Sequence, residues 1–320
     1  MDVDLPGRPS TVKTLPGVPG LGGLYARAVL PGWPRLPGRG GEEPDDASLP
    51  EVTYRAADVV ADPEHLVRYQ RLLGEPVDDV LPAGFVHVLA FPVAMALMVR
   101  PDFPLPLAGM VHLANTVTVA RTIRSDERLE VHAWARGLVP HPRGTQVELV
   151  TEVTARYGAG DAMEVVWRGV STYLAKGVTR SGVGAGGSAA APASAPFTPP
   201  MPTARWALDA GTGRRYAAVS GDRNPIHLSA LTAKAFGFPR AIAHGMYTAA
   251  RALAESGVGR AGAGRSGAVE WTVEFAKPVL LPSSVAVSIT GDEASGFEYV
   301  GWDARRGKEH FRGHVTPGAS

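Results

Sequence analysis

Apolar residues in the carboxy-terminal part of the chain first recur at helical spacing and then alternate with polar residues. The helical spacing predicts three helices, and a glycine follows each of the last two as a stop. The alternation predicts a series of antiparallel strands joined by tight turns. The predicted helices cover 209–219, 229–236 and 245–256, and the predicted strands cover 268–275, 284–291, 297–303 and 309–316.

The amino-terminal part shows the same order of patterns. A continuous apolar run at 85–99, which contains His87 and Pro92, predicts a buried core helix. It is shorter than the roughly 20 residues that a membrane span needs, so we expect no membrane segment there. The strands predicted to follow it cover 110–121, 127–137, 145–157 and 164–175.

An internal repeat relates the two parts. Each part places one long helix before strands that are long enough to wrap around it. This order predicts an α+β fold of the double hot-dog type, an internal pseudo-dimer in which each long helix fills a curved antiparallel sheet. The matched residues, at one constant offset of 147, are Arg68-Tyr69 with Arg215-Tyr216, Gly74 with Gly221, and Phe91-Pro92 with Phe238-Pro239.

Two segments rich in proline and glycine divide the chain. Residues 1–50 lack a sustained period and predict an irregular leader with a short helix at 21–30, which we expect to contribute little to chemistry. Residues 177–203 contain GVGAGGSAAAPASAPFTPP, a composition typical of a flexible linker. The predicted domains are therefore an amino-terminal half at 51–176 and a carboxy-terminal half at 204–320.

Composition excludes several classes of protein. With 32 Lys and Arg against 31 Asp and Glu, no overall charge favours nucleic acid or an anionic membrane as a partner. The absence of cysteine removes disulfides, thiolate nucleophiles and Cys-ligated metal sites. The amino terminus lacks the basic and apolar regions of a secretory signal. We therefore expect a cytoplasmic protein.

The densest chemistry lies between 216 and 246, where Asp222 and His227 are five residues apart. Pro225 fixes its own backbone and keeps Asn224 out of helical conformation, so the loop that carries them is stiff. A carboxylate beside an imidazole can move a proton on and off a substrate or a water. The alternative is structural, with Asp222 capping a turn and His227 hydrogen-bonded at a helix start.

A second feature is His244-Gly245-Met246, at the start of the predicted helix 245–256. Backbone N–H groups at a helix start lack intrahelical partners and carry the positive end of the helix dipole, so Gly245 can bind an oxyanion. Close helix packing is the alternative reason for a glycine here. A metal site on His227 and His244 is a third possibility, which the lack of a nearby carboxylate at ligand spacing disfavours.

The repeat predicts a single working site, in the carboxy-terminal half, because the scaffold recurs but the polar residues do not. In the other half Pro92 interrupts the apolar helix and predicts a kink that opens space in that half. The offset of 147 pairs Asp222, Asn224 and His227 with Glu75, Val77 and Val80, and pairs His244 and Gly245 with Leu97 and Met98.

The stretch YAAVSGDRNPIHLSALTAKAFGFPRAIAHGM at 216–246 resembles the signature of the MaoC-like, R-specific enoyl-CoA hydratases. The paired layout extends the resemblance to 51–316, where the chain is similar to actinobacterial double-hot-dog (3R)-hydroxyacyl-thioester dehydratases. The strand pattern VEFAKPVLLP at 273–282 strengthens this similarity. The leader and the linker lie outside it.

This resemblance implies reversible interconversion of a (3R)-3-hydroxyacyl thioester and a trans-2-enoyl thioester plus water, with no metal or redox cofactor. The acyl carrier would be coenzyme A or acyl carrier protein. Asp222 and His227 would hold the water and exchange protons with it and with C2 of the substrate. Asn224 would orient them, and the Gly245 amide would polarise the thioester carbonyl. The substrate-binding residues would be Ser220, His244, Met246 and Lys277.

Two other functions are compatible with this fold, because fold alone does not fix chemistry. A thioesterase would attack the thioester carbonyl instead of C2 and C3. A non-catalytic subunit would only bind the acyl thioester, although the retention of Asp222, Asn224 and His227 argues against that. Two assemblies are compatible with an internal pseudo-dimer, a monomer and a homodimer.

Overall fold

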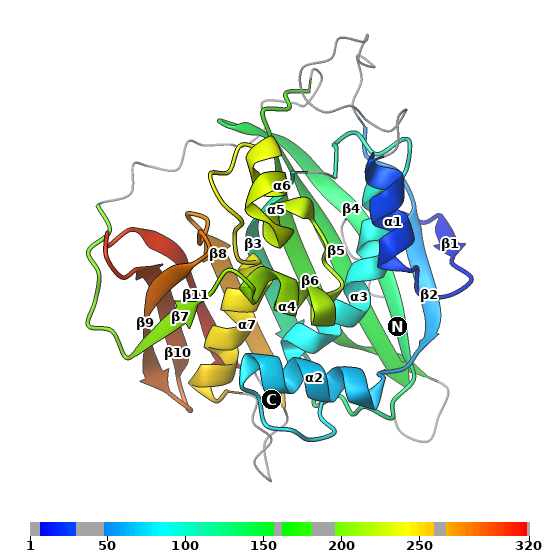
Figure 1. The fold of residues 1–320 in the computed structure, drawn as a ribbon. Coiled ribbons are helices and arrows are strands. Elements are labelled where there is room, and N and C mark those ends of the chain that lie inside the picture. Colours follow the sequence, from blue (N-terminus) through cyan, green and yellow to red (C-terminus); the bar gives the residue numbers. More distant parts are fainter. Residues whose placement is uncertain are drawn as a thin grey trace.

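The computed structural model describes residues 7–29, 48–107, 109–156, 162–180, 196–258 and 267–318. Within these residues, eleven strands form one curved sheet, and the helices lie on its concave side (Figure 1). The strand order is β1-β2-β4-β5-β6-β3-β8-β11-β10-β9-β7. The α+β double hot-dog prediction is confirmed.

The elements of both halves follow the predicted order. The first half contains β2 (Thr53–Val59), α2 (Pro63–Leu73), α3 (Ala83–Met98), β3 (Val111–Val119), β4 (Leu129–His141), β5 (Gly144–Arg156) and β6 (Met163–Lys176). The second half contains β7 (Ala204–Leu208), α4 (Thr212–Ser220), α5 (Pro225–Leu228), α6 (Ala230–Ala235), α7 (Gly245–Ser256), β8 (Val269–Phe275), β9 (Ser283–Asp292), β10 (Gly296–Asp303) and β11 (Glu309–Pro317).

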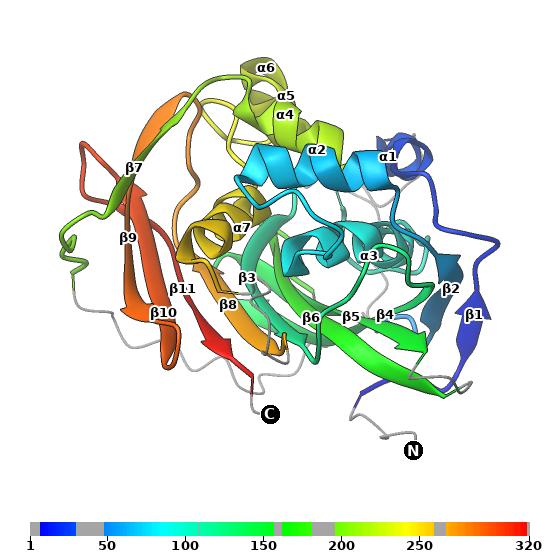
Figure 2. The same ribbon diagram turned by 90° about the horizontal axis from the view of Figure 1, so that it is seen from below.

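The two halves meet where β3 pairs with β8, antiparallel and with Asn115 opposite Val273. On either side of this seam the strands follow in equivalent order, so the sheet has an approximate internal twofold. Figure 2 shows the sheet curving around α3 and α7, with α2 and α4 lying outside these two helices. The pseudo-dimer is therefore built on one continuous sheet.

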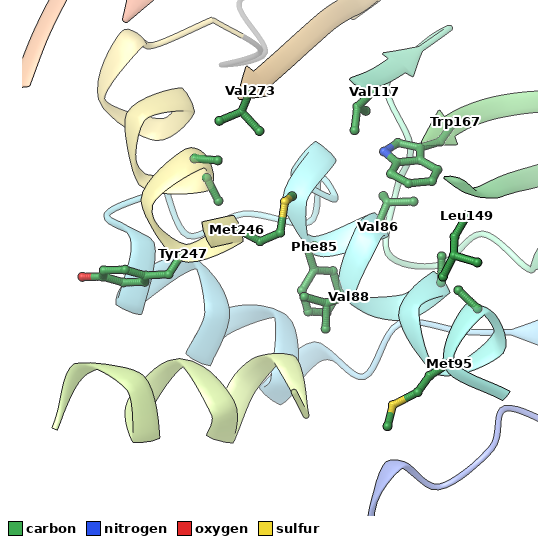
Figure 3. Close-up of a cluster of buried hydrophobic side chains, with 14 of the residues drawn as sticks. Phe85, Val86, Val88, Met95, Val117, Leu149, Trp167, Met246, Tyr247 and Val273 are labelled. Atoms are coloured by element: carbon green, nitrogen blue, oxygen red, sulfur yellow. The ribbon is translucent and has the colours of Figure 1, made fainter. Parts of the chain in front are cut away.

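The core lies between the sheet and the two central helices. Thirteen of the sixteen residues of α3 are buried, because this helix is apolar around its whole circumference. Figure 3 shows Met246 of α7 pointing towards α3, where Phe85 lies. The predicted core helix is confirmed, and it continues through Pro92 to Met98. No helix in the described ranges is long and apolar enough to cross a membrane.

The constant offset of 147 holds for only part of the repeat. Gly74 and Gly221 both end a helix in the left-handed conformation, with φ of 78° and 72°. After that the halves differ, since α3 begins nine residues past Gly74 and α7 begins 24 residues past Gly221. The additional residues of the second half form α5 and α6 and the loop after them.

The pairing of Phe91-Pro92 with Phe238-Pro239 is therefore wrong. The first pair lies inside α3, and the second lies in the loop that precedes α7. The counterpart of Gly245 is the start of α3 at Ala83, not Met98. The first half joins its two helices by the short segment 75–82, where the second half has 222–244, so the absence of the polar residues there goes with a shorter loop.

The leader is more ordered than its composition predicts. The short helix is confirmed as α1 (Leu21–Val29). A strand that the sequence did not reveal, β1 (Val12–Thr14), pairs in parallel with β2, with Val12 opposite Thr53. The predicted leader and linker residues at 1–6, 30–47 and 181–195 lie outside the described residues. The division into domains remains a prediction.

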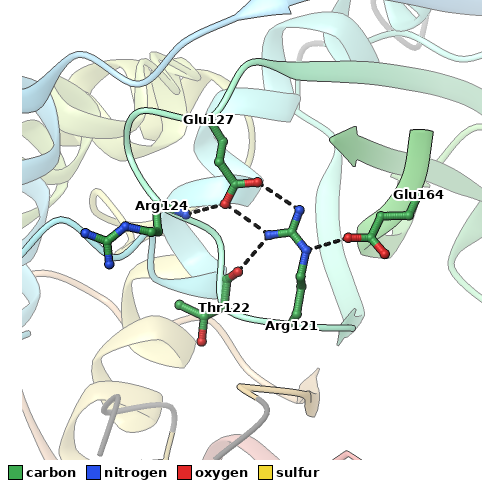
Figure 4. A network of polar contacts seen from close by, with 5 residues as sticks. All are labelled: Arg121, Thr122, Arg124, Glu127 and Glu164. Atoms are coloured by element: carbon green, nitrogen blue, oxygen red, sulfur yellow. Dashed lines mark hydrogen bonds and ion pairs between the residues drawn. The ribbon is translucent and has the colours of Figure 1, made fainter. Parts of the chain in front are cut away.

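A charged network fixes the loop after β3 (Figure 4). The guanidinium of Arg121 donates to Glu127 at 2.8 Å, to Glu164 at 2.5 Å and to the carbonyl of Thr122 at 2.9 Å. Glu127 also accepts the backbone N–H of Arg124 at 2.7 Å. Because several charges share one guanidinium, this network ties the loop to β6 more firmly than one surface ion pair would.

Candidate active site

The loop that follows α4 is held by its own side chains. Gly221 turns the chain in a conformation that favours glycine, and a side chain there would meet Leu21. The hydroxyl of Ser220 accepts the N–H of Asp222 at 3.2 Å, and Asp222 Oδ1 accepts the N–H of Asn224 at 3.0 Å. Asn224 in turn caps α5 by accepting the N–H of Ile226 at 3.4 Å. The predicted stiffness of this loop thus has a local cause.

Three hydrogen bonds join this loop to the start of α7. Ile242 donates its N–H to the carbonyl of Ile226 at 3.1 Å. The Nδ1 of His227 donates to the carbonyl of Ile242 at 2.9 Å, and the Nε2 of His244 donates to the carbonyl of Asp222 at 2.9 Å. The two imidazole rings stack with their centroids 3.7 Å apart. The helix start and the loop therefore form one rigid unit.

The hydrogen bonds of His227 and His244 to backbone carbonyls show which nitrogen of each imidazole has no backbone partner. Burial, with the neighbouring His244, lowers the pKa of His227 to about 3, so this ring is neutral at physiological pH. Since its Nδ1 donates to a carbonyl, its Nε2 carries a lone pair and can accept a proton. Burial also lowers the pKa of His244. Its Nδ1 has no hydrogen-bond partner among the described residues.

The carboxyl of Asp222 remains ionised in this setting. Burial raises its pKa, but the two histidines and the hydroxyl of Tyr25 lower it by more, so that the pKa lies below its ordinary value. The side chain is 26% exposed. Because Asp222 lines a cavity, that exposed part faces the cavity. The neutral imidazole of His227 and the ionised carboxylate of Asp222 therefore lie next to each other.

The start of α7 has unpaired amide donors. Its N-cap residue, His244, makes no side-chain hydrogen bond to the first turn, so the leading N–H groups lack a partner within the helix. A Cβ on Gly245 would lie 2.8 Å from the ring of Phe275. Close packing therefore requires a glycine at this position, and Gly245 itself lines the cavity described below.

A cavity of about 380 Å³ brings the predicted residues together. All eight predicted site residues line it, including the exposed Lys277 and the buried Met246, which also packs in the core. The eight are Ser220, Asp222, Asn224, His227, His244, Gly245, Met246 and Lys277. The predicted residues thus lie together on part of the wall that the carboxy-terminal half provides, and the same wall also contains Tyr216, Phe275 and His310, which the sequence did not single out as site residues.

The first half provides the opposite wall, which sequence analysis missed. Its polar members are His87, His112 and Tyr173, and the ring of His112 stacks on Tyr173 with centroids 4.5 Å apart. A histidine in a fully apolar run was the available signal for His87. The apolar members are Val88, Phe91, Met98, Leu107, Met110, Val111, Leu113 and Leu174.

Two further sets of lining residues were also missed. The exposed Arg143 and Lys176 join Lys277 in lining the cavity, so a cationic rim lies where the cavity meets the surface. Tyr25 of α1 lines the cavity too, and its hydroxyl donates to Asp222 Oδ1. The leader thus places a side chain in the cavity, which its composition did not predict.

The same cluster offers ligands that could hold a metal ion. Asp222, His227 and His244 each have a ligand atom within 4.8 Å of the others. One nitrogen of each ring already donates to a backbone carbonyl, which leaves His227 Nε2, His244 Nδ1 and the carboxylate.

The chain is similar in sequence and fold to several known proteins. The MaoC like domain family model matches residues 191–300. A 3-hydroxyacyl-thioester dehydratase X of Mycobacterium tuberculosis is 35% identical over 260 residues, which are 81% of this chain and 85% of that protein. The crystal structure of HtdX from the same organism matches with a TM-score of 0.68 and 32% identity, over 83% of this chain and 99% of HtdX.

A MaoC-like dehydratase from Phytophthora capsici, 19% identical, has the same fold, with a TM-score of 0.60 over 84% of this chain and 96% of its own. The identity to the mycobacterial dehydratase extends through both halves, well beyond the residues that the family model matches. The polar loop, the glycine at the start of α7 and the paired sheet are thus found in a chain that belongs to the MaoC-like dehydratase family.

Proposed function

We propose that this protein catalyses the reversible dehydration of (3R)-3-hydroxyacyl thioesters to trans-2-enoyl thioesters, as a hydro-lyase. One observation carries the proposal: an ionised carboxylate, a neutral imidazole and the amide start of α7 share one cavity. The (3R) configuration is carried over from the family resemblance. We also propose a cytoplasmic location and an internal pseudo-dimer that acts alone or as a homodimer.

In the hydration direction, water would bind between His227 Nε2 and the carboxylate of Asp222. The thioester carbonyl would accept the N–H of Gly245, which draws electrons from the double bond. As the water oxygen bonds to C3, its proton passes to His227 Nε2 and the π electrons move to C2 and the carbonyl oxygen. The imidazolium then returns this proton to C2.

Dehydration is the reverse of this sequence, in which His227 takes the proton from C2 and gives it to the departing hydroxyl. Asp222 would accept a hydrogen bond from the water and stabilise the imidazolium. Atoms balance, because one O–H bond and one π bond are exchanged for one C–O and one C–H bond. Asn224 and Ser220 would act indirectly, by holding the loop that orients Asp222.

The acyl carrier would be coenzyme A or acyl carrier protein, both of which carry pantetheine on a phosphate. Arg143, Lys176 and Lys277 support this, because exposed cations at the rim of an otherwise largely apolar cavity can pair with that phosphate. The apolar wall of the first half would receive the acyl chain. His244 and Met246 would flank the reacting end.

The test is loss of the enoyl absorbance of crotonyl-CoA or a longer 2-enoyl-CoA, with chiral analysis of the product. We expect the (3R) alcohol, and a fall of about 10² to 10⁴ in rate for Asp222→Asn and for His227→Ala. His314→Ala and Asp292→Asn are matched controls on the exposed surface of the second half and should retain the full rate. Undiminished turnover in both site variants would refute the proposal.

Two further measurements separate the alternatives. A thioesterase would release free thiol from an acyl thioester, which a thiol reagent detects, and a binding subunit would do neither reaction. Dialysis against a chelator should leave the rate unchanged, because the proton transfers proposed here use only His227 and Asp222. A rate that falls with chelator and returns with added metal would instead assign the cluster to metal binding.

A further inference from the structure

Tyr25 joins the leader to the proposed catalytic carboxylate. It lies 197 residues before Asp222 in the chain, yet its hydroxyl donates to Asp222 Oδ1 and its side chain lines the cavity. Oδ1 also accepts the N–H of Asn224 at 3.0 Å. One oxygen of the carboxylate is thus held by two donors from different parts of the chain.

Several packing contacts place α1 at this position. Leu24 is buried in the core, and α1 contacts α3 (Figure 1). Leu21 occupies the space that a side chain on Gly221 would need, so α1 rests on the glycine that ends α4. Upstream of the helix, β1 pairs with β2 of the main sheet. The contact between Tyr25 and Asp222 therefore follows from how the leader folds onto both halves.

The hydroxyl of Tyr25 is the hydrogen-bond donor in this contact. Burial and the nearby carboxylate raise the pKa of Tyr25 far above its ordinary value, so it stays protonated at any physiological pH. A neutral hydroxyl on an ionised carboxylate makes a charge-assisted hydrogen bond, which is stronger than a neutral one. It fixes the rotation of the carboxyl group about its last bond.

We infer that Tyr25 is a positioning residue, which holds Oδ1 of Asp222 so that Oδ2 faces the water and His227. The surroundings of Oδ2 differ from those of Oδ1, since His244 Nε2 lies 3.8 Å from Oδ2. The leader thereby supplies part of the active site, and the site has contributions from three segments of the chain. This inference rests on the proposed function.

The test compares Tyr25→Phe with the unaltered protein in hydration of 2-enoyl-CoA. The variant keeps the ring and loses only the donor, so kcat should fall about tenfold with little change in KM. Without this donor Asp222 binds its proton at higher pH, so the acid limb of the pH profile of kcat should move to higher pH. Leu24→Ala, which loosens α1 but keeps the hydroxyl of Tyr25, should also lower kcat.

Tyr54→Phe is the matched control. The hydroxyl of this buried tyrosine of β2 accepts a hydrogen bond from Arg100 at 2.9 Å, and the residue does not line the cavity. It should leave kcat and the pH profile unchanged. An unchanged kcat and pH profile in Tyr25→Phe would overturn the inference. A higher kcat would overturn it too, since α1 would then obstruct the site.

A measurement that needs no turnover distinguishes failure of this inference from failure of the proposed function. The carboxyl carbon of Asp222 can be followed by NMR during a pH titration, with its signal assigned from Asp222→Asn. Tyr25→Phe should raise the pKa of this carboxyl even if the protein hydrates no enoyl thioester. An unchanged titration would refute the contact, whatever the enzyme assay gives.

Discussion

Gly245 opens α7 directly beside the ring of Phe275, and the distance available decides what this position tolerates. A Cβ there would lie between 2.8 and 3.0 Å from three ring carbons, closer than packed carbon atoms approach. Gly245→Ala should therefore displace Phe275 or the helix start and move the amide away from the substrate carbonyl. We expect a fall of about 10² in kcat, measured as loss of enoyl absorbance.

Phe275→Leu provides the matched comparison, because it relieves the contact at the glycine without adding an atom to the helix. In the double variant, the larger space should restore part of the activity that Gly245→Ala loses. An alanine at 245 that leaves kcat unchanged would show that the amide takes no part in the reaction.

At the scale of elements, α3 combines a structural and a substrate-binding role. Val88 and Met98 of this helix line the cavity, whereas Phe85 and Met95 are fully buried in the core. We predict that Val88→Phe shortens the space for the acyl chain. Its kcat/KM should fall about tenfold or more for dodecenoyl-CoA and stay near normal for crotonyl-CoA.

The readout is the ratio of the two rates, which a general loss of folded protein would not change. Leu107→Ala enlarges the same wall from the loop after α3 and should shift the ratio the other way. Equal losses for both chain lengths in Val88→Phe would place the acyl chain elsewhere.

At the scale of the whole molecule, the two walls of the cavity contain several buried histidines that are neutral at physiological pH. Burial lowers the pKa of His87 to about 4, and it lowers those of His112 and His227 to about 3. Each titrates near 6.5 in the unfolded chain, so below that pH the unfolded state binds more protons than the folded state. The stabilisation is complete above about pH 6.5 and is lost as the pH falls towards 3.

The free energy of unfolding should therefore fall on acidification, by about 1.4 kcal/mol per pH unit for each such histidine within this window. Denaturant unfolding at a series of pH values measures the slope. His112→Gln removes one of these groups without touching the proposed dyad, so its slope should be smaller by about one proton. A stability that is flat between pH 6 and 4 would contradict this prediction.

Local pattern was sufficient for most of the elements and for eight of the residues that line the cavity. The apolar run at 85–99 predicted α3 and the helix at 245–256 predicted α7, because periodicity is set by neighbours in the chain. The spacing of Asp222 and His227 and the stiff Asn224-Pro225 turn could be recognised for the same reason. The internal repeat was recognised too, but its register failed where the second half carries α5 and α6.

The sequence by itself thus determined the fold class, the two related halves and which polar residues the loop after α4 carries. Only the tertiary structure decided what faces that loop. His87, His112 and Tyr25 come from segments more than a hundred residues away. The β3–β8 pairing and the packing of α1 bring these segments to the loop, and periodicity in the sequence does not predict such contacts. Local sequence sets which elements form, whereas the surface between elements depends on long-range packing of the whole sheet.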